Sequence, residues 1–357
     1  MLIQKYLAQM FQANASDIHF KVGKPPAIRT TEGIKVLDVS PLSDKEVLEI
    51  LKSILPQKLL DKLMSEKIDV DFAYQDTEYG RFRANAYFQR GKISISMRAL
   101  PAQVPGFKEL GLPDVVEQLA LMTRGLVLVT GPAGSGKTTT LASIVEFINN
   151  HLPWHIITIE DPLEIIHKDK KSVIEQREVG GDVPSFGLAL KFVLRQDPNM
   201  VLIGEMRDRE TIEAAIRLAE SGTLVFGTLH TLDVNETISR VVDFFPAELQ
   251  DQFRLSLAAT LRGVISQRLI TSSITHKKVL ATEVMIVDKL FQDFIRDKKD
   301  YKIRESIAQN TTQGMQTFDQ CLMKLFVDKV LSLEDLELAS YNFHDLKIEL
   351  QKKGLIN

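Results

Sequence analysis

One short stretch of this chain limits its fold more than any other. Residues 131–138 read GPAGSGKT and match G-x-x-x-x-G-K-[ST], the pattern of a phosphate-binding P-loop. Residues 125–130 before it are apolar and β-branched, and residues 139–149 after it carry apolar side chains at helical spacing. Strand, glycine-rich loop and helix in this order predict an α/β unit that binds a nucleoside triphosphate, because loop amides and a helix N-terminus together attract phosphate.

We expect the nucleotide to contact the whole loop and the residue after it. Lys137 can reach the β- and γ-phosphates, and the Thr138 hydroxyl can ligate Mg²⁺. A glycine-rich turn arising by chance is the alternative, but it leaves the flanking strand and helix unexplained. The expected nucleotide-binding residues are Gly131, Pro132, Ala133, Gly134, Ser135, Gly136, Lys137, Thr138 and Thr139.

The order of parts along the 357 residues indicates more than one domain. Residues 1–100 predict a small α+β domain, with a strand near 17–22, a capped helix after Ser43 and a hairpin of strands 80–88 and 93–98. Residues 101–113 are rich in proline and glycine and predict a linker. Strands then alternate with helices over residues 114–281, which predicts a mostly parallel sheet covered on both faces. Residues 282–357 predict a mainly helical C-terminal region.

Composition narrows the class of protein. The formal net charge of -3 gives no overall basic footprint for nucleic acid. The lone Cys321 excludes an internal disulfide and a four-cysteine zinc site, and it favours a reducing, cytosolic compartment. No apolar run approaches the ~20 residues that span a bilayer, so we expect no transmembrane segment.

Three strand ends carry residues suited to hydrolysis, which needs a held metal, an oriented water and positive charge. Glu160 and Asp161 end one apolar run; they suit Mg²⁺, directly or through water, or they form an exposed acidic turn. Glu205 ends a second run in the manner of a Walker B acid and suits both polarising water and assisting Mg²⁺. Thr228 and His230 follow a third apolar run. Either residue can hydrogen-bond the γ-phosphate or its water, and the alternative is a structural role.

Positive charge for the transition state is missing from these motifs. Arg81, Arg83 and Arg98 alternate with apolar or neutral residues on the predicted hairpin, and Arg81 and Arg83 share one face by the period of two. They are either a solvated face or arginine fingers that reach a nucleotide in this or a neighbouring subunit.

Together these motifs resemble a known family, the secretion-type hexameric ATPases, and within it the type IV pilus retraction branch (twitching motility, PilT-like). The motifs in order are the Walker A loop at 131–138, an acidic box at 159–164, a Walker B segment at 204–208 and a histidine box at 227–231. Residues 176–180 and 194–198 between them are also typical, and residues 16–19 and 314–317 are similar to N- and C-terminal signatures of the family.

The resemblance implies a PAS-like N-terminal domain, a RecA-like ATPase core and a homohexameric ring. It implies ATP and Mg²⁺ as cofactors and hydrolysis at subunit interfaces, with Glu205, Glu160 and His230 as catalytic residues and Arg81, Arg83 and Arg98 near the nucleotide. The implied partners are an inner-membrane pilus platform protein, met from the cytoplasmic side, and other pilus ATPases.

Some features depart from the family pattern. Extension and type II secretion relatives usually carry a long extra N-terminal region and four zinc-binding cysteines; their lack here favours retraction. The Ala-Ile-Arg-like motif usual in the retraction branch is poorly matched by residues 292–297, and Gln196 replaces an acid often found before Asp197. Both departures are compatible with an accessory retraction ATPase. The alternatives are an extension or type II secretion ATPase, a regulatory nucleotide-binding subunit with little hydrolysis, and a RecA-like nucleic-acid motor.

Overall fold

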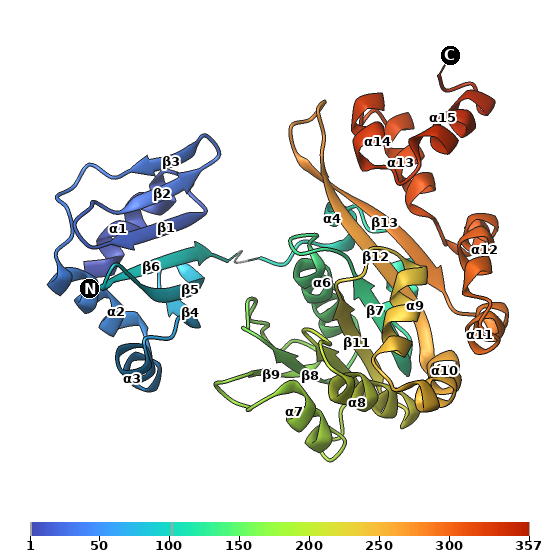
Figure 1. Cartoon of the computed structure of the whole chain (residues 1–357), viewed down its shortest axis with the longest axis horizontal. Helices are drawn as coiled ribbons and strands as arrows, with labels where there is room; N and C mark the ends of the chain where they lie inside the picture. Colours follow the sequence, from blue (N-terminus) through green and yellow to red (C-terminus); the bar gives the residue numbers. More distant parts are fainter. Residues whose placement is uncertain (1, 101–102, 357) are drawn as a thin grey trace. The chain divides into compact units, whose positions relative to one another are not determined.

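The computed structural model describes residues 2–100 and 103–356, which divide into two compact units (Figure 1). The first unit comprises residues 1–103 together with the short segment 162–166. The second comprises residues 104–161 and 167–357. Residues 101 and 102 of the expected linker lie outside the described residues.

The first unit is built on an antiparallel sheet in the order β3-β2-β1-β6-β5-β4. Alternate side chains of β5, such as Phe82, Ala84 and Ala86, are buried in the core shared with the helices. The capping box predicted at Ser43 is present at the start of α2. The strands are β1 (Asp17–Lys21), β2 (Ala27–Thr30), β3 (Gly33–Val36), β4 (Val70–Asp76), β5 (Gly80–Gln89) and β6 (Lys92–Ala99), and the helices are α1 (Leu2–Gln12), α2 (Asp44–Ile54) and α3 (Gln57–Glu66).

The second unit is built on a sheet in the order β13-β12-β7-β11-β10-β8-β9. Every neighbouring pair is parallel except β12 and β13, so the alternation of strands and helices correctly predicts a mostly parallel sheet. The strands are β7 (Gly125–Thr130), β8 (His155–Glu160), β9 (Val173–Glu178), β10 (Met200–Ile203), β11 (Leu224–Leu229), β12 (Leu261–Thr271) and β13 (Lys278–Ile286).

Helices cover both faces of this sheet because its strands are apolar on both faces. Val127 and Val129 of β7 pack with α4 (Phe107–Leu110), α5 (Val115–Ala120) and α6 (Lys137–His151). Leu126 and Leu128 face the opposite core, which contains α7 (Phe186–Val193), α8 (Arg209–Glu220), α9 (Val234–Asp243), α10 (Ala247–Thr260), α11 (Lys289–Arg296) and α12 (Ile303–Gln309).

The C-terminal helices form a smaller cluster against β13. Apolar side chains of α13 (Phe318–Val327), α14 (Leu333–Ala339) and α15 (Phe343–Lys352) pack with Ala281 of that strand. The boundary expected between residues 281 and 282 falls inside β13, which pairs with β12 from Lys278 to Ile286. Likewise α4 lies within the stretch expected as a linker, because Phe107 is buried in the core of the second unit.

None of the helices in these described ranges combines the length and the apolar character that crossing a bilayer requires.

Candidate functional site

The P-loop connects β7 to α6, as its sequence predicts. Gly131, Gly134 and Gly136 have φ angles of 144°, 76° and 92°, a region that side chains with a Cβ rarely adopt. A Cβ on Gly131 would lie 2.2 Å from the carbonyl oxygen of Gln267 on β12. Gln267 also donates from Nε2 to the carbonyl of Ser135 at 2.8 Å. The loop is therefore tightly seated on the neighbouring strand, and glycine at position 131 is what permits this approach.

Lys137 is the first residue of α6, and its side chain turns back into the loop. Its Nζ donates to the carbonyl oxygens of Gly131 at 2.6 Å and Pro132 at 3.1 Å. Burial lowers the pKa of Lys137, an effect that the nearby Glu205 carboxylate opposes. Thr138 beside it is exposed, and Thr139 is half-buried.

Glu205 follows the end of β10, and two side chains hold its carboxylate. Arg207 contacts both oxygens, with Nε 2.5 Å from Oε1 and Nη2 2.6 Å from Oε2. His230 Nε2 lies 3.0 Å from Oε1. Burial alone would raise the pKa of Glu205, but the bonds and charges of Arg207 and His230 outweigh it and the pKa is lowered. The carboxylate is therefore ionised at neutral pH, as a general base must be.

His230 joins this carboxylate to the P-loop lysine. Its Nδ1 lies 3.4 Å from Lys137 Nζ, while its Nε2 faces Glu205. Since an ammonium group can only donate, Nδ1 accepts and Nε2 carries the hydrogen that is donated to Glu205. A continuous polar contact thus runs from lysine through imidazole to carboxylate, with the imidazole half exposed to solvent.

Glu160 ends β8 at the same edge of the sheet. Its Oε1 accepts hydrogen bonds from Thr158 Oγ1 at 2.7 Å and Gln176 Nε2 at 3.4 Å. Asp161 beside it is exposed. Strands β7, β11, β10 and β8 are parallel neighbours in that order, so their carboxyl ends place the P-loop, His230, Glu205 and Glu160 side by side.

Two neighbouring residues have structural roles. The Thr228 hydroxyl, considered above as a phosphate ligand, is buried and donates to the carbonyl of Gly204 at 2.5 Å, so it is turned away from such a role. Asp208 caps α8 by accepting from the Thr211 amide at 2.8 Å.

The three arginines of the hairpin each contact a residue of the first unit. Arg81 Nε donates to the carbonyl of Leu163 at 2.9 Å. Arg83 and Arg98 lie directly opposite each other on β5 and β6, where like charges repel. Glu164 lies 3.3 Å from Arg83 and Asp17 lies 2.8 Å from Arg98, so each cation has its own acid. Their role toward a nucleotide stays a prediction.

Some residues of this site were missed by sequence reasoning. Arg207 lies two positions after the Walker B acid Glu205, and this spacing could have identified it as a partner of that carboxylate. Gln267 stands 132 positions from the carbonyl it binds, and no local motif marks it. Within the described ranges no cluster of three or more His, Cys, Asp or Glu side chains forms a metal site.

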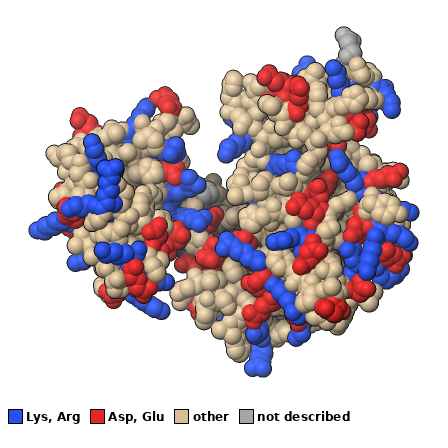
Figure 2. All heavy atoms as spheres, viewed as in Figure 1, with Lys and Arg blue, Asp and Glu red and all other residues tan. Residues whose placement is uncertain are grey.

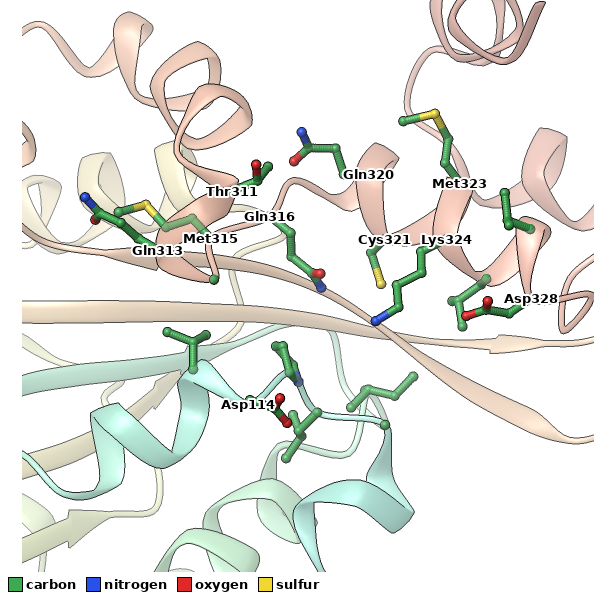
Figure 3. Close-up of a pocket in the computed structure, with 18 of the residues that line it drawn as sticks. Asp114, Thr311, Gln313, Met315, Gln316, Gln320, Cys321, Met323, Lys324 and Asp328 are labelled. Atoms are coloured by element: carbon green, nitrogen blue, oxygen red, sulfur yellow. The ribbon is translucent and has the colours of Figure 1, made fainter. Parts of the chain in front are cut away.

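A separate pocket of about 1340 Å³ lies at the C-terminal helices (Figure 3). Gln316, Cys321 and Lys324 line it from one side and Asp114 from the segment before α5. Residues 314–316 of the C-terminal signature line this pocket.

Comparisons with known proteins identify the family of this chain. Residues 1–317 match the family described as Type II/IV secretion system protein. The chain is 41% identical over 335 residues to the type IV pilus retraction ATPase PilT of Pseudomonas aeruginosa, covering 94% of this chain and 97% of that protein. It is 33% identical over 351 residues to the type IV pilus ATPase PilU of the same organism, covering 98% and 92%.

Solved structures extend the likeness to the fold. A crystal structure of the pilus retraction motor PilT with bound ADP superposes with a TM-score of 0.90 at 43% identity, covering 98% of this chain and 99% of that one. The ATPase DotB of Legionella pneumophila gives a TM-score of 0.82 at 27% identity, covering 94% of each chain. The predicted α/β ATPase fold and the resemblance to the pilus retraction branch are confirmed, and the chain belongs to the Type II/IV secretion system protein family.

Proposed function

We propose that this chain is an ATP-hydrolysing motor that powers type IV pilus retraction, and hence twitching motility. The observation that carries the proposal is the contact from Lys137 through His230 to Glu205 at the edge of the sheet that bears the P-loop. This arrangement places a phosphate-binding cation, a polar relay and an ionised carboxylate on adjacent strands. The likeness to a pilus retraction ATPase over nearly the whole chain supports the choice of work that the hydrolysis drives.

In this proposal each residue has a defined task. The P-loop amides and Lys137 bind the phosphates of ATP. Glu205 orients and deprotonates the attacking water, since its pKa is lowered and it is ionised at neutral pH. His230 couples phosphate binding to the base. When phosphate oxygens bind Lys137, His230 Nδ1 loses its contact with Lys137 Nζ, and this alters the hydrogen bond from Nε2 to Glu205.

A magnesium ion fits the donors at this edge of the sheet. The Thr138 hydroxyl is exposed at the start of α6, and hard carboxylate oxygens stand at Glu160, Asp161 and Glu205. These oxygens are the ligand type that magnesium selects, directly or through water, with phosphate oxygens completing its shell. The ion would neutralise charge on the β- and γ-phosphates.

We propose a homohexamer in which Arg81, Arg83 and Arg98 supply positive charge to a nucleotide at a subunit interface. We further propose that the ring docks from the cytoplasm on an inner-membrane platform protein of the pilus machine and works with other pilus ATPases. Nucleic acid is not an expected partner, since acidic and basic side chains are interspersed on the face shown in Figure 2 and the net charge is -3.

The biochemical test compares the wild-type protein with Lys137→Ala and Glu205→Gln. We expect Lys137→Ala to lose ATP binding and Glu205→Gln to keep binding while turnover falls by roughly 10²–10⁴-fold, the usual contribution of a general base. Wild-type turnover in Glu205→Gln would contradict the assignment of the base. Undetectable phosphate release by the wild type would favour a regulatory subunit, and stimulation by single-stranded DNA a nucleic-acid motor.

The cellular test scores surface pili in a strain that lacks the protein. Excess, unretracted pili are the expected result, because assembly would continue without removal. Cells without pili would contradict retraction and indicate an extension motor.

A further inference from the structure

The loop that carries His230 is anchored through buried hydroxyls. This His230 loop, residues 230–233, joins β11 to α9. Thr231 Oγ1 lies 2.7 Å from Thr237 Oγ1, which in turn donates to Thr130 Oγ1 at 3.4 Å. Thr130 ends β7, and its hydroxyl lies 2.8 Å from that of Ser266 on β12. One side of the loop is thus connected to the strand that leads into the P-loop.

A buried carboxylate anchors the other side of the loop. Glu283 on β13 is 3% exposed and stands opposite Ser266 in the sheet. Its Oε1 accepts from the amide of Val234 at 2.9 Å, and its carboxylate also accepts from the amide of Phe318. Val234 opens α9 and Phe318 opens α13, so one carboxylate binds the first amides of two helices. Helix N-termini favour negative charge, and such charge-assisted bonds are stronger than neutral ones.

Charged groups surround Glu283 from each element packed against it. Burial raises the pKa of Glu283 to about 6, Asp233 on the His230 loop acts in the same direction, and Arg304 of α12 and the two amides oppose them. Arg268 of β12 interacts with Glu283, and Asp319 of α13 interacts with Arg268. The Glu283 carboxyl therefore gains or loses its charge near pH 6, within the range over which ATP hydrolysis can be measured.

The start of α13 is firmly attached to β13 beside this carboxylate. Val284 and Gln316 exchange backbone hydrogen bonds at 2.8 and 3.2 Å. The Gln316 side chain donates to the carbonyl of Thr282 at 3.1 Å, and the Thr282 amide lies 3.4 Å from Cys321 Sγ. Figure 3 shows Gln316 and Cys321 directed toward the strands. Glu283 therefore joins the His230 loop to a rigid part of the C-terminal region.

We propose that Glu283 is a positioning residue for ATP hydrolysis: its carboxylate holds the first turn of α9 beside α13 and so keeps His230 between Lys137 and Glu205. The inference rests on the proposed function, because it assigns a support to the same site. It gives the C-terminal helical region a direct part in turnover, although that region contributes no residue to the P-loop edge.

Glu283→Gln is the informative variant, because it keeps the shape of the side chain and removes its charge. At pH 7.5 we expect kcat to fall about fivefold, which corresponds to the lost charge assistance of the two hydrogen bonds, with KM for ATP within about twofold of wild type. The wild-type kcat should fall toward that of the variant as the pH drops through about 6. The variant should lack this step.

Hydrogen exchange of residues 229–236 in the nucleotide-free protein gives a second readout that does not depend on turnover. Faster exchange in Glu283→Gln is expected, because the Val234 amide loses a charged acceptor. A wild-type kcat in the variant at pH 7.5, a pH profile that keeps the step, or unchanged exchange would each overturn the inference. A wild-type protein that does not hydrolyse ATP would instead refute the proposed function, and the exchange result would still decide the positioning role.

Asp335→Asn is the matched control. Asp335 is also a buried helix-capping carboxylate, accepting from the amides of Ser332 at 2.8 Å and Ser273 at 3.1 Å, but it contacts no part of the His230 loop. We expect this variant to lower the unfolding temperature and to leave kcat and its pH profile as in the wild type. A loss of kcat equal to that of Glu283→Gln would show that any buried cap has this effect and would overturn the assignment to Glu283.

Discussion

Replacing Gly131 with alanine tests how tightly the P-loop is seated on the sheet. The added Cβ would lie 2.2 Å from the carbonyl oxygen of Gln267 and 2.6 Å from Ser135 Oγ, and the φ angle of 144° is itself unfavourable for alanine. Backbone strain of this kind costs about 1–3 kcal/mol. Overpacking against a backbone atom adds about 1–3 kcal/mol. We therefore expect the second unit to lose roughly 2–6 kcal/mol of unfolding free energy.

Gly134→Ala is the matched control for this prediction. Gly134 also has a positive φ, 76°, but a Cβ there would meet nothing within 4 Å. Its cost is the strain alone, about 1–2 kcal/mol. The two variants differ chiefly in the clash with β12, which amounts to about 1–3 kcal/mol, or roughly 2–12 °C in the unfolding temperature of a unit of this size.

Calorimetry and ATP titration together provide the assay. Gly131→Ala should unfold at a lower temperature than Gly134→Ala and should lose ATP binding, because the loop must leave β12 to accommodate the methyl group. Gly91→Ala, with a φ of 72° in the β5–β6 hairpin and open space around it, should cost a similar strain without affecting ATP binding. Equal unfolding temperatures for Gly131→Ala and Gly134→Ala would refute the reasoning, since they would mean that the close approach to β12 carries no energy.

Three further predictions concern charge. Arg207→Gln should raise the pKa of Glu205 toward its ordinary range, since the cation that lowers it is removed, and the acid limb of the rate profile should move to higher pH. The pKa of Glu283 is 4.5 in the unfolded chain and about 6 in the folded protein. The unfolding free energy of the wild type should therefore fall by on the order of 2 kcal/mol as the pH rises from 4.5 to 6. Urea titrations over this range should show the fall in the wild type and not in Glu283→Gln. Glu164→Gln should leave Arg83 without its acid and lower the unfolding free energy of the first unit by less than about 1 kcal/mol, because the pair is exposed. The loss should be larger in low salt than in high salt, and an effect independent of salt would contradict this origin.

Sequence motifs predicted those parts of the site that depend only on a short stretch of the chain. The P-loop and the strand ends at Glu160, Glu205 and His230 follow from short motifs, because each needs only a strand end and the residues after it. The lateral order of the strands did not follow from pattern, since crossovers place β11 between β7 and β10. For that reason the contact of His230 with both Lys137 and Glu205 was not foreseen.

Other misses share a cause, namely long-range pairing. Thr228 was expected as a phosphate ligand from its place at a strand end, but its hydroxyl donates to the carbonyl of Gly204, the residue that follows β10. Gln267 on β12 and Glu283 on β13 are far from the P-loop in the sequence, so no nearby motif marks them. The boundary expected near residue 282 failed to anticipate β13 for a similar reason, because the antiparallel partner strand sets its length.

The segment 162–166 has a practical consequence for dividing this protein. It belongs to the first unit although it is encoded between β8 and β9, so the chain passes between the units at 103–104, 161–162 and 166–167. A fragment ending at residue 103 would lack the Leu163 carbonyl that binds Arg81 and the Glu164 carboxylate that pairs with Arg83. Chimaeras between relatives should therefore exchange residues 1–103 and 162–166 as one discontinuous module, so that Arg81 and Arg83 keep these acceptors.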